Sequence, residues 1–321
     1  MFEFQTVWGW QPALYLFLGG MGAGAFITAT VLSFVDRQRH RSTIGLSMWA
    51  AAICLIVGLL LLLSELVFPL RGMAAWESFV NFSSWMTYGA WGVLVAVIVF
   101  ILAAFCTSPS TARFLATIWK GFPAARDSVC TVLSVIGSLL GVFVAVYTGV
   151  LLMSAPGIPF WNTPLLPVLF TVSALDTGVA LVEIIAIANR KRGRMTASVA
   201  QLLDKFVVVL VVIEAIVLSI FVFTSVSGGG SEVALAAAAS ANAWISGTLA
   251  PYFWCLVVLC GLLAPIVVAA MSLKMHGKDT SILTLSGAVG ALIGGCALRF
   301  IVLMAGTHAD LIAQTVAIVA G

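Results

Sequence analysis

Five charged residues stand inside long apolar stretches of the chain. They are Glu65, Asp176, Glu183, Glu214 and Arg299. A charged side chain in the hydrocarbon core of a bilayer costs several kcal/mol, so such residues are rare there. Those that remain usually bind a ligand or carry protons. These five are therefore the first candidates for the chemistry of this protein.

A second set of polar groups lies toward one end of the same stretches. Gln11 and Tyr15 are spaced i, i+4 and share one face of the first expected helix. Counting residues places Tyr147 and Arg299 roughly 10 Å, and Glu65 about 5 Å, from the ends of their helices. Such groups suit a quinone headgroup, which needs hydrogen-bond donors, a proton acceptor and apolar walls. The predicted quinone site comprises Gln11, Tyr15, Glu65, Tyr147, Trp161 and Arg299.

Four of these six residues also have a structural explanation. A tryptophan at a helix end is typical of the interfacial belt of a membrane protein, which would account for Trp161. Tyr147 can hydrogen bond across helices, and Glu65 can pair with Arg71. Arg299 can neutralise a buried carboxylate. The shared depth of these residues on one side of the membrane favours a binding site.

Three acidic residues lie deeper in the membrane. Asp176 and Glu214 fall near the middle of their apolar segments, and Glu183 follows Asp176 by two turns on the same helix face. A carboxylate at mid-membrane keeps its proton unless it is paired. We therefore predict a proton pathway through Asp176, Glu183 and Glu214. The alternative is a fixed network in which Arg299 pairs with Asp176 or Glu214.

The elements that must position these residues are transmembrane helices. The chain of 321 residues is 62% hydrophobic and 8% charged, which is far from the composition of a soluble domain. Backbone groups in lipid must be satisfied within each helix, and a helix of about 20 residues crosses the hydrocarbon core. Eight segments qualify: about 12–34, 46–68, 85–106, 128–154, 165–189, 205–226, 249–273 and 282–305. We predict an all-α integral membrane protein with residues 1–321 in a single domain.

Basic residues fall in alternate loops between these segments. Thirteen of the fifteen lysines and arginines follow the first, third, fifth and seventh segments. Cytoplasmic loops are rich in Lys and Arg, so both termini are predicted on the periplasmic side. A nucleic-acid-binding surface is a weaker explanation of the same charges. We expect this protein to lie in the lipid bilayer and to bind no nucleic acid.

Ligands for a metal or a haem are scarce. His40, His276 and His308 all lie outside the expected helices, whereas a membrane b-type haem takes its histidines from within them. The six cysteines are scattered singly, without the CxxC pairs of iron–sulfur and zinc sites. We expect this protein to hold no haem and no metal.

The most distinctive stretch of the sequence is YTGVLLMSAPGIPFWNTPLLPVLFTVSALDTG, residues 147–178. Three others accompany it: WGWQPALYLFLGGMGAGAF (8–26), LDKFVVVLVVIEAIVL (203–218) and LRFIVLMAG (298–306). Together they resemble the NrfD/PsrC family, the integral membrane subunits of polysulfide reductase and related enzymes. The resemblance extends in order over nearly the whole sequence.

The resemblance implies two four-helix bundles and no cofactor bound by this subunit. It also implies a quinol site near the outer face, in which Tyr147 is the tyrosine beside the quinone. The implied partners are a periplasmic four-cluster iron–sulfur subunit and a molybdopterin catalytic subunit. Some relatives have an asparagine and a histidine roughly where Gln11 and Tyr15 stand, so Glu65 is the expected proton acceptor here.

We therefore expect a membrane anchor and quinol-oxidising subunit of an anaerobic respiratory oxidoreductase, in the cytoplasmic membrane of a bacterium or archaeon. Menaquinol or ubiquinol would be its substrate, and electrons would pass to the iron–sulfur partner. Two alternatives stay open. A secondary ion or proton transporter would show helices broken near the membrane midplane. A structural anchor would have no quinone site of its own.

Overall fold

The computed structural model describes residues 4–5, 8–65, 85–118, 120–155, 157–190, 196–229, 231–275 and 280–308. The elements are α1 (Trp10–Glu65), α2 (Trp85–Thr107), α3 (Pro109–Ile118), α4 (Phe122–Met153), α5 (Leu165–Ala188), α6 (Ala197–Val226), α7 (Glu232–Ile245), α8 (Ala250–Tyr252), the π-helix η3 (Phe253–Leu263), α9 (Ala264–Lys274) and α10 (Ser281–Met304). Seven helices in these ranges are long and apolar enough to cross a membrane. The prediction of an all-α integral membrane protein is confirmed.

The first helix folds back on itself. α1 has 56 residues and would extend about 84 Å if it were straight, far more than one bilayer. At Asp36 the backbone leaves the helical region, with φ −158° and ψ 80°. Asp36 Oδ1 accepts the backbone N–H of Arg39 at 3.1 Å, the bond by which an aspartate caps the start of a helix. A new helical half therefore begins here.

The two halves of α1 pack side by side in opposite directions. A Cβ built on Gly22 would lie 2.9 Å from the carbonyl oxygen of Ala51, and one on Gly58 would lie 3.5 Å from the ring of Tyr15. Divided at Asp36, α1 (Trp10–Glu65) supplies the first predicted segment, 12–34, and the described part of the second, 46–68. This division supports eight crossings of the membrane. The seven long apolar helices of the described residues include α1 as a single helix. The eight-crossing count therefore stays a prediction.

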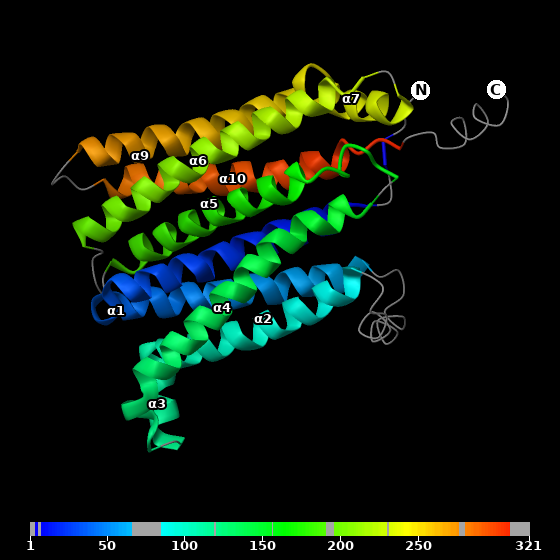
Figure 1. Ribbon diagram of the computed structural model, residues 1–321. Helices are drawn as coiled ribbons and strands as arrows, with labels where there is room; N and C mark the ends of the chain where they lie inside the picture. Colours follow the sequence, from blue (N-terminus) through cyan, green and yellow to red (C-terminus); the bar gives the residue numbers. More distant parts are fainter. Residues whose placement is uncertain are drawn as a thin grey trace.

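The two ends of the described structure meet. Phe4 and Thr307 form an isolated antiparallel bridge, and the backbone N–H of Gln5 donates to the carbonyl of Gly306 at 2.7 Å. The start of α1 and the end of α10 therefore lie at the same end of the molecule (Figure 1). An even number of crossings would give this arrangement. The periplasmic position of that end stays a prediction.

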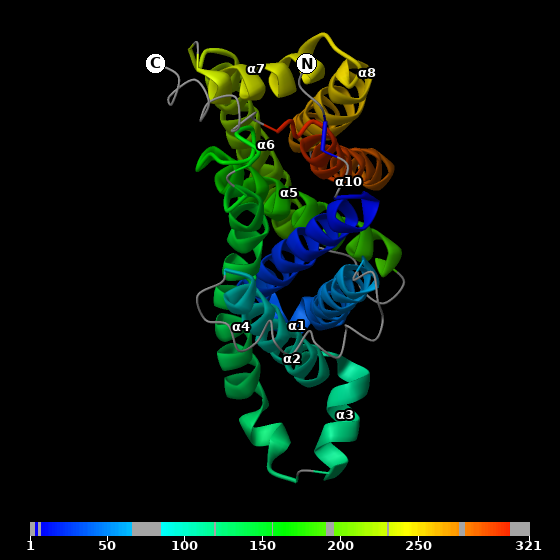
Figure 2. The same ribbon diagram turned by 90° about the vertical axis from the view of Figure 1, so that its right-hand side faces the viewer.

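The helices form two groups that meet along α1 and α5. α2 and α4 pack on α1, whereas α6 and α10 pack on α5. Figure 2 shows α6, α8 and α10 in the upper part and α2, α3 and α4 in the lower part, with α1 and α5 between them. Small residues allow α1 and α5 to approach closely: a Cβ built on Gly24 would lie 2.8 Å from the carbonyl carbon of Ala174. This contact fixes the side of α1 that faces α5.

The predicted segment 249–273 is helical, but it changes from an α-helix to a π-helix and back. It comprises α8, the π-helix η3 and α9. Pro265, near the start of α9, has no backbone N–H to donate to the preceding turn. A π-helical register is one way in which a helix accommodates such a loss. The backbone stays helical from Ala250 to Lys274, so this segment lacks the break that a transporter would show.

Candidate functional site

Two buried tyrosines meet where α1, α2 and α4 pack together. Tyr15 is 5% exposed and Tyr147 is 7% exposed, and the two phenols are close enough to interact electrostatically. The ring of Tyr147 stacks on Phe143, with centroids 5.8 Å apart and planes 10° apart. It occupies the space beside Gly89 of α2, where any Cβ would overlap the ring. The absence of a side chain at this glycine therefore makes room for the phenol.

The fold-back of α1 brings the position of Glu65 close to that of Gln11. Gly58 lies opposite Tyr15, and the two halves run in opposite directions. Glu65 follows Gly58 by seven residues, about two turns, on the same helix face. Its backbone therefore lies alongside the start of α1, where Gln11 is partly exposed. The side chain of Glu65, and all of its suggested partner Arg71, lie outside the described residues.

Trp161 caps the end of α10. It is 1% exposed, its Nε1 donates to the carbonyl of Val302 at 2.8 Å, and its ring packs on Trp8. Trp244 Nε1 donates to Ile301 at 3.1 Å, and Gln5 Nε2 donates to Leu303 at 3.0 Å. Carbonyl groups in the last turn of a helix need partners from outside it. We call the donors Gln5, Trp161 and Trp244 the α10 cap.

Arg299 is fully buried between α10 and α5. One terminal nitrogen donates to Ser173 Oγ at 2.5 Å and to the carbonyl of Gly295 at 2.9 Å. The other donates to the carbonyl of Phe170 at 3.2 Å, and the guanidinium lies 5.0 Å from the centre of the Phe170 ring. The charge is therefore held by neutral groups and an aromatic face.

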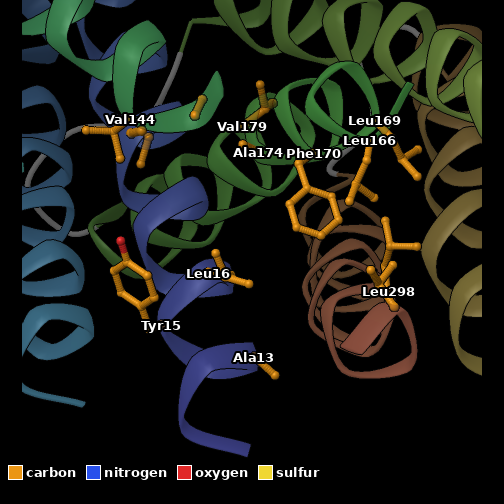
Figure 3. Packing of buried hydrophobic residues seen from close by; sticks show 14 of the residues in the cluster. Ala13, Tyr15, Leu16, Val144, Leu166, Leu169, Phe170, Ala174, Val179 and Leu298 are labelled. Carbon is orange, nitrogen blue, oxygen red and sulfur yellow. The ribbon is translucent and has the colours of Figure 1, made fainter. Parts of the chain in front are cut away.

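Arg299 and Tyr15 lie on different sides of α1. Figure 3 shows Tyr15 pointing away from Leu16, whereas Leu16 points toward Phe170. A Cβ built on Gly20 would lie 3.5 Å from the Arg299 guanidinium, and Gly20 is about 140° around the helix from Tyr15. The predicted quinone-site residues therefore do not converge on one point. Tyr15 and Tyr147 come together, whereas Arg299 and Trp161 serve the contacts of α10.

A polar cluster joins α5, α6 and α10. Ser173 accepts from Arg299, and Glu214 on α6 interacts electrostatically with Arg299. Asp176 interacts electrostatically with both Glu214 and Arg299. Its Oδ1 and the Nε of Arg299 have no hydrogen-bond partner. Among the described residues Arg299 forms no direct ion pair, so the fixed network expected as an alternative would act through electrostatic interaction without a salt bridge.

A cleft lies beside this cluster, between α5, α6, α9 and α10. It is narrow, with a volume of about 10 Å³, and Asp176, Glu183 and Asp204 are among the residues that line it. Glu214 is absent from its lining, so the three predicted pathway acids do not share one space. Asp204 was not among the predicted pathway residues. The sequence feature that could have identified Asp204 is its position, because it is an acidic residue seven positions after the start of an apolar helix.

Cysteine and histidine do not gather in the part of the protein that the structure describes. The six cysteines are free, and no group of three His, Cys, Asp or Glu side chains is placed to hold a metal ion in these ranges. His276 lies outside the described residues. The expectation that this protein binds neither haem nor metal stays a prediction.

Comparison with known proteins identifies the family to which this protein belongs. Residues 2–309 match the family model described as "Polysulphide reductase, NrfD". The sequence is 32% identical to the C subunit of polysulfide reductase from Wolinella succinogenes, over 94% of each protein. It is 29% identical to protein NrfD of Escherichia coli, over 95% of the present sequence and 96% of that protein. The protein therefore belongs to the NrfD/polysulfide reductase family of multi-pass membrane subunits of respiratory oxidoreductase complexes, located in the bacterial inner membrane.

Proposed function

We propose that this protein is the membrane anchor and quinol-oxidising subunit of its complex. The observation that carries the proposal is the pair of buried phenols, Tyr15 and Tyr147, where α1, α2 and α4 meet. A polysulfide reductase subunit among its relatives supports a redox role for the complex. The electron acceptor in this proposal is a periplasmic four-cluster iron–sulfur subunit, which passes electrons to a molybdopterin catalytic subunit.

The chemistry needs hydrogen-bond donors and one proton acceptor. Oxidation of menaquinol or ubiquinol to the quinone releases two electrons and two protons. The Tyr147 hydroxyl donates to one oxygen of the headgroup, and the Gln11 amide lies near the entrance of the site. As the electrons leave, Glu65 takes one proton and passes it to water outside, and then takes the second in the same way. The stacked rings of Phe143 and Tyr147 supply a flat wall for the headgroup.

The six predicted residues divide into two roles in this proposal. Gln11, Tyr15, Glu65 and Tyr147 contact the quinol. Trp161 and Arg299 position the helices around it, because their hydrogen bonds hold the end of α10 and the face of α5. A structural anchor would contain the same helices but would not need the phenolic hydroxyl.

Replacement of Tyr147 by phenylalanine tests the site. This change keeps the ring that packs on Phe143 and beside Gly89, and it removes only the hydroxyl. We expect quinol oxidation by the intact complex to fall about 10²-fold, as when one preorganised donor is lost. Binding of a hydroxyquinoline N-oxide inhibitor, followed by fluorescence quenching, should weaken in parallel. Both are measured on the purified complex.

Tyr252→Phe is the matched control, since Tyr252 is 55% exposed and far less enclosed. It should leave oxidation and inhibitor binding unchanged. If the Tyr147→Phe complex assembles and oxidises quinol at the wild-type rate, the anchor alternative replaces this proposal.

A further inference from the structure

Three carboxyl groups follow one another along the cleft between α5, α6, α9 and α10. Asp204 lies near the start of α6, and its Oδ2 accepts a hydrogen bond from Ser272 Oγ at 2.8 Å. Ser272 Oγ also contacts Thr280 Oγ1 at 3.2 Å, which joins the end of α9 to the start of α10. These helix ends lie together in Figure 1, at the end of the molecule that carries the basic loops. Asp204 therefore stands at the mouth of the cleft.

Glu183 connects the mouth with the interior. It is 4% exposed and lines the same cleft. It interacts electrostatically with Asp204 on one side and with Asp176 on the other. The three acids therefore form a continuous series from the helix ends to the middle of α5.

Asp176 ends the series with an unused acceptor. It is 2% exposed, and its Oδ1 has no hydrogen-bond partner. Buried polar oxygens are nearly always paired, either with protein or with water. An unpaired carboxyl oxygen on a residue that lines a cleft is free to accept a proton that arrives along it.

Beyond Asp176 the route is closed to positive charge. The charged groups that face Asp176 are Glu183 on its own helix, Glu214 on α6 and Arg299 on α10. Arg299 is held in place by its hydrogen bonds to Ser173 Oγ and to the carbonyl groups of Gly295 and Phe170. A fixed guanidinium is an electrostatic barrier to protons and cations in membrane channels. The space in the cleft is narrow, with room for about one water molecule at a time, so a hydrated metal cation does not fit.

We propose that this cleft is a one-sided proton inlet, which runs from Asp204 through Glu183 to Asp176 and stops there. At each step one O–H bond breaks and another forms on the next oxygen, directly or through water, so no oxidant or reductant is required. Glu214 does not line the cleft and is not part of the inlet. The inlet stands independently of the quinol site, because none of its residues contacts the tyrosine pair.

Hydrogen–deuterium exchange at Asp176 tests the inlet. The carbonyl stretch of a protonated carboxyl group shifts in deuterium oxide, and infrared spectroscopy of the complex in lipid follows that shift. The band of Asp176 is the one that disappears in Asp176→Asn. We expect rapid exchange in the wild type, slowed by about 10²-fold in Asp204→Asn and in Glu183→Gln, since each loses one proton carrier. Both changes are isosteric, so the helices should pack as before.

Two variants serve as controls. Asp127→Asn removes a carboxylate that is 65% exposed and pairs with Arg41, and it should leave the exchange rate unchanged. Glu214→Gln should also leave it unchanged, because Glu214 does not line the cleft. Wild-type exchange rates in either Asp204→Asn or Glu183→Gln would overturn the proposal. Slower exchange in Glu214→Gln, or a wild-type spectrum without an Asp176 band, would overturn it as well.

Discussion

The guanidinium of Arg299 is kept in the membrane by neutral partners. Its two terminal nitrogens donate to one hydroxyl and two carbonyl oxygens, on α5 and on its own helix. Arginine suits this position because its planar group directs several donors at fixed angles. A lysine has a single nitrogen and cannot reach Ser173 and Phe170 in the same way. The residue therefore acts mainly as a tie between α10 and α5.

Replacement of Arg299 should lower the stability of the fold. We expect Arg299→Leu to reduce the free energy of unfolding by about 1–3 kcal/mol, because Ser173 Oγ and the carbonyl group of Phe170 lose a buried donor. Arg299→Lys should recover only part of this loss. Thermal unfolding of the purified protein in detergent measures the change, with Arg113→Leu on the exposed side of α3 as the control.

A direct quinone contact would give another pattern. In that case Arg299→Lys would raise the KM for quinol while Tm stayed at the wild-type value. That result would mean that Arg299 contacts the quinone directly, as Tyr147 is proposed to do.

The types of residue in the sequence predicted which charged side chains are buried better than they predicted the hydrogen-bond partners of those side chains. The sequence predicted that Asp176, Glu183, Glu214 and Arg299 lie inside the membrane, and the structure buries all four. Partners were harder to predict, since they depend on which faces of distant helices meet. Trp161 illustrates this limit: its type favours an interface, but only the fold shows that it caps α10.

Helices were predictable wherever hydropathy alone determines them. The segments expected at 165–189 and 282–305 agree closely with α5 (Leu165–Ala188) and α10 (Ser281–Met304). α3 (Pro109–Ile118) was not predicted, because ten residues within a basic loop are too short and too polar for a crossing. α7 (Glu232–Ile245), with Ser231 as its cap, is likewise too short to be identified by hydropathy as a crossing.

The approach of α1 to α5 depends on the absence of side chains at Gly24 and Gly178. We expect Gly24→Ala to lower the free energy of unfolding by about 1–3 kcal/mol, because the new Cβ would meet the backbone of Ala174. Gly19→Ala is the matched control on the same helix. Its Cβ would find its nearest neighbour, Thr148, at 3.8 Å. Thermal unfolding measures both variants.

Equal stability of the two alanine variants would contradict this account. It would mean that α1 and α5 can separate slightly without cost, so that their contact is not a determinant of the fold.

At the scale of the whole molecule, the two helix groups separate the two proposed functions. The tyrosine pair lies among α1, α2 and α4, whereas the acidic cleft lies among α5, α6, α9 and α10. The contact between α1 and α5 is the main connection between these groups. This separation could not be predicted from spacing along the sequence. Tyr147 and Asp176 lie on consecutive long helices, α4 and α5, and yet they belong to different groups.

The joined ends give a prediction about orientation. Phe4 and Thr307 form a bridge, so both ends should lie on the same side of the membrane. The basic loops place that side in the periplasm. Alkaline phosphatase, which is active only outside the cytoplasm, should be active when fused at either end and inactive when fused within the loop at 190–194. The reverse pattern would mean that the basic loops face outward.

The α10 cap has a consequence for how the protein is made. Gln5, Trp161 and Trp244 are synthesised well before the carbonyl groups of residues 301–303 that accept their hydrogen bonds. Until the ribosome has released the last helix, all three donors lack these acceptors. Their burial therefore marks the moment at which the last helix has joined the fold. A prematurely terminated product would leave two indoles without acceptors at this end of the molecule, which makes it recognisable to the quality-control proteases of the membrane.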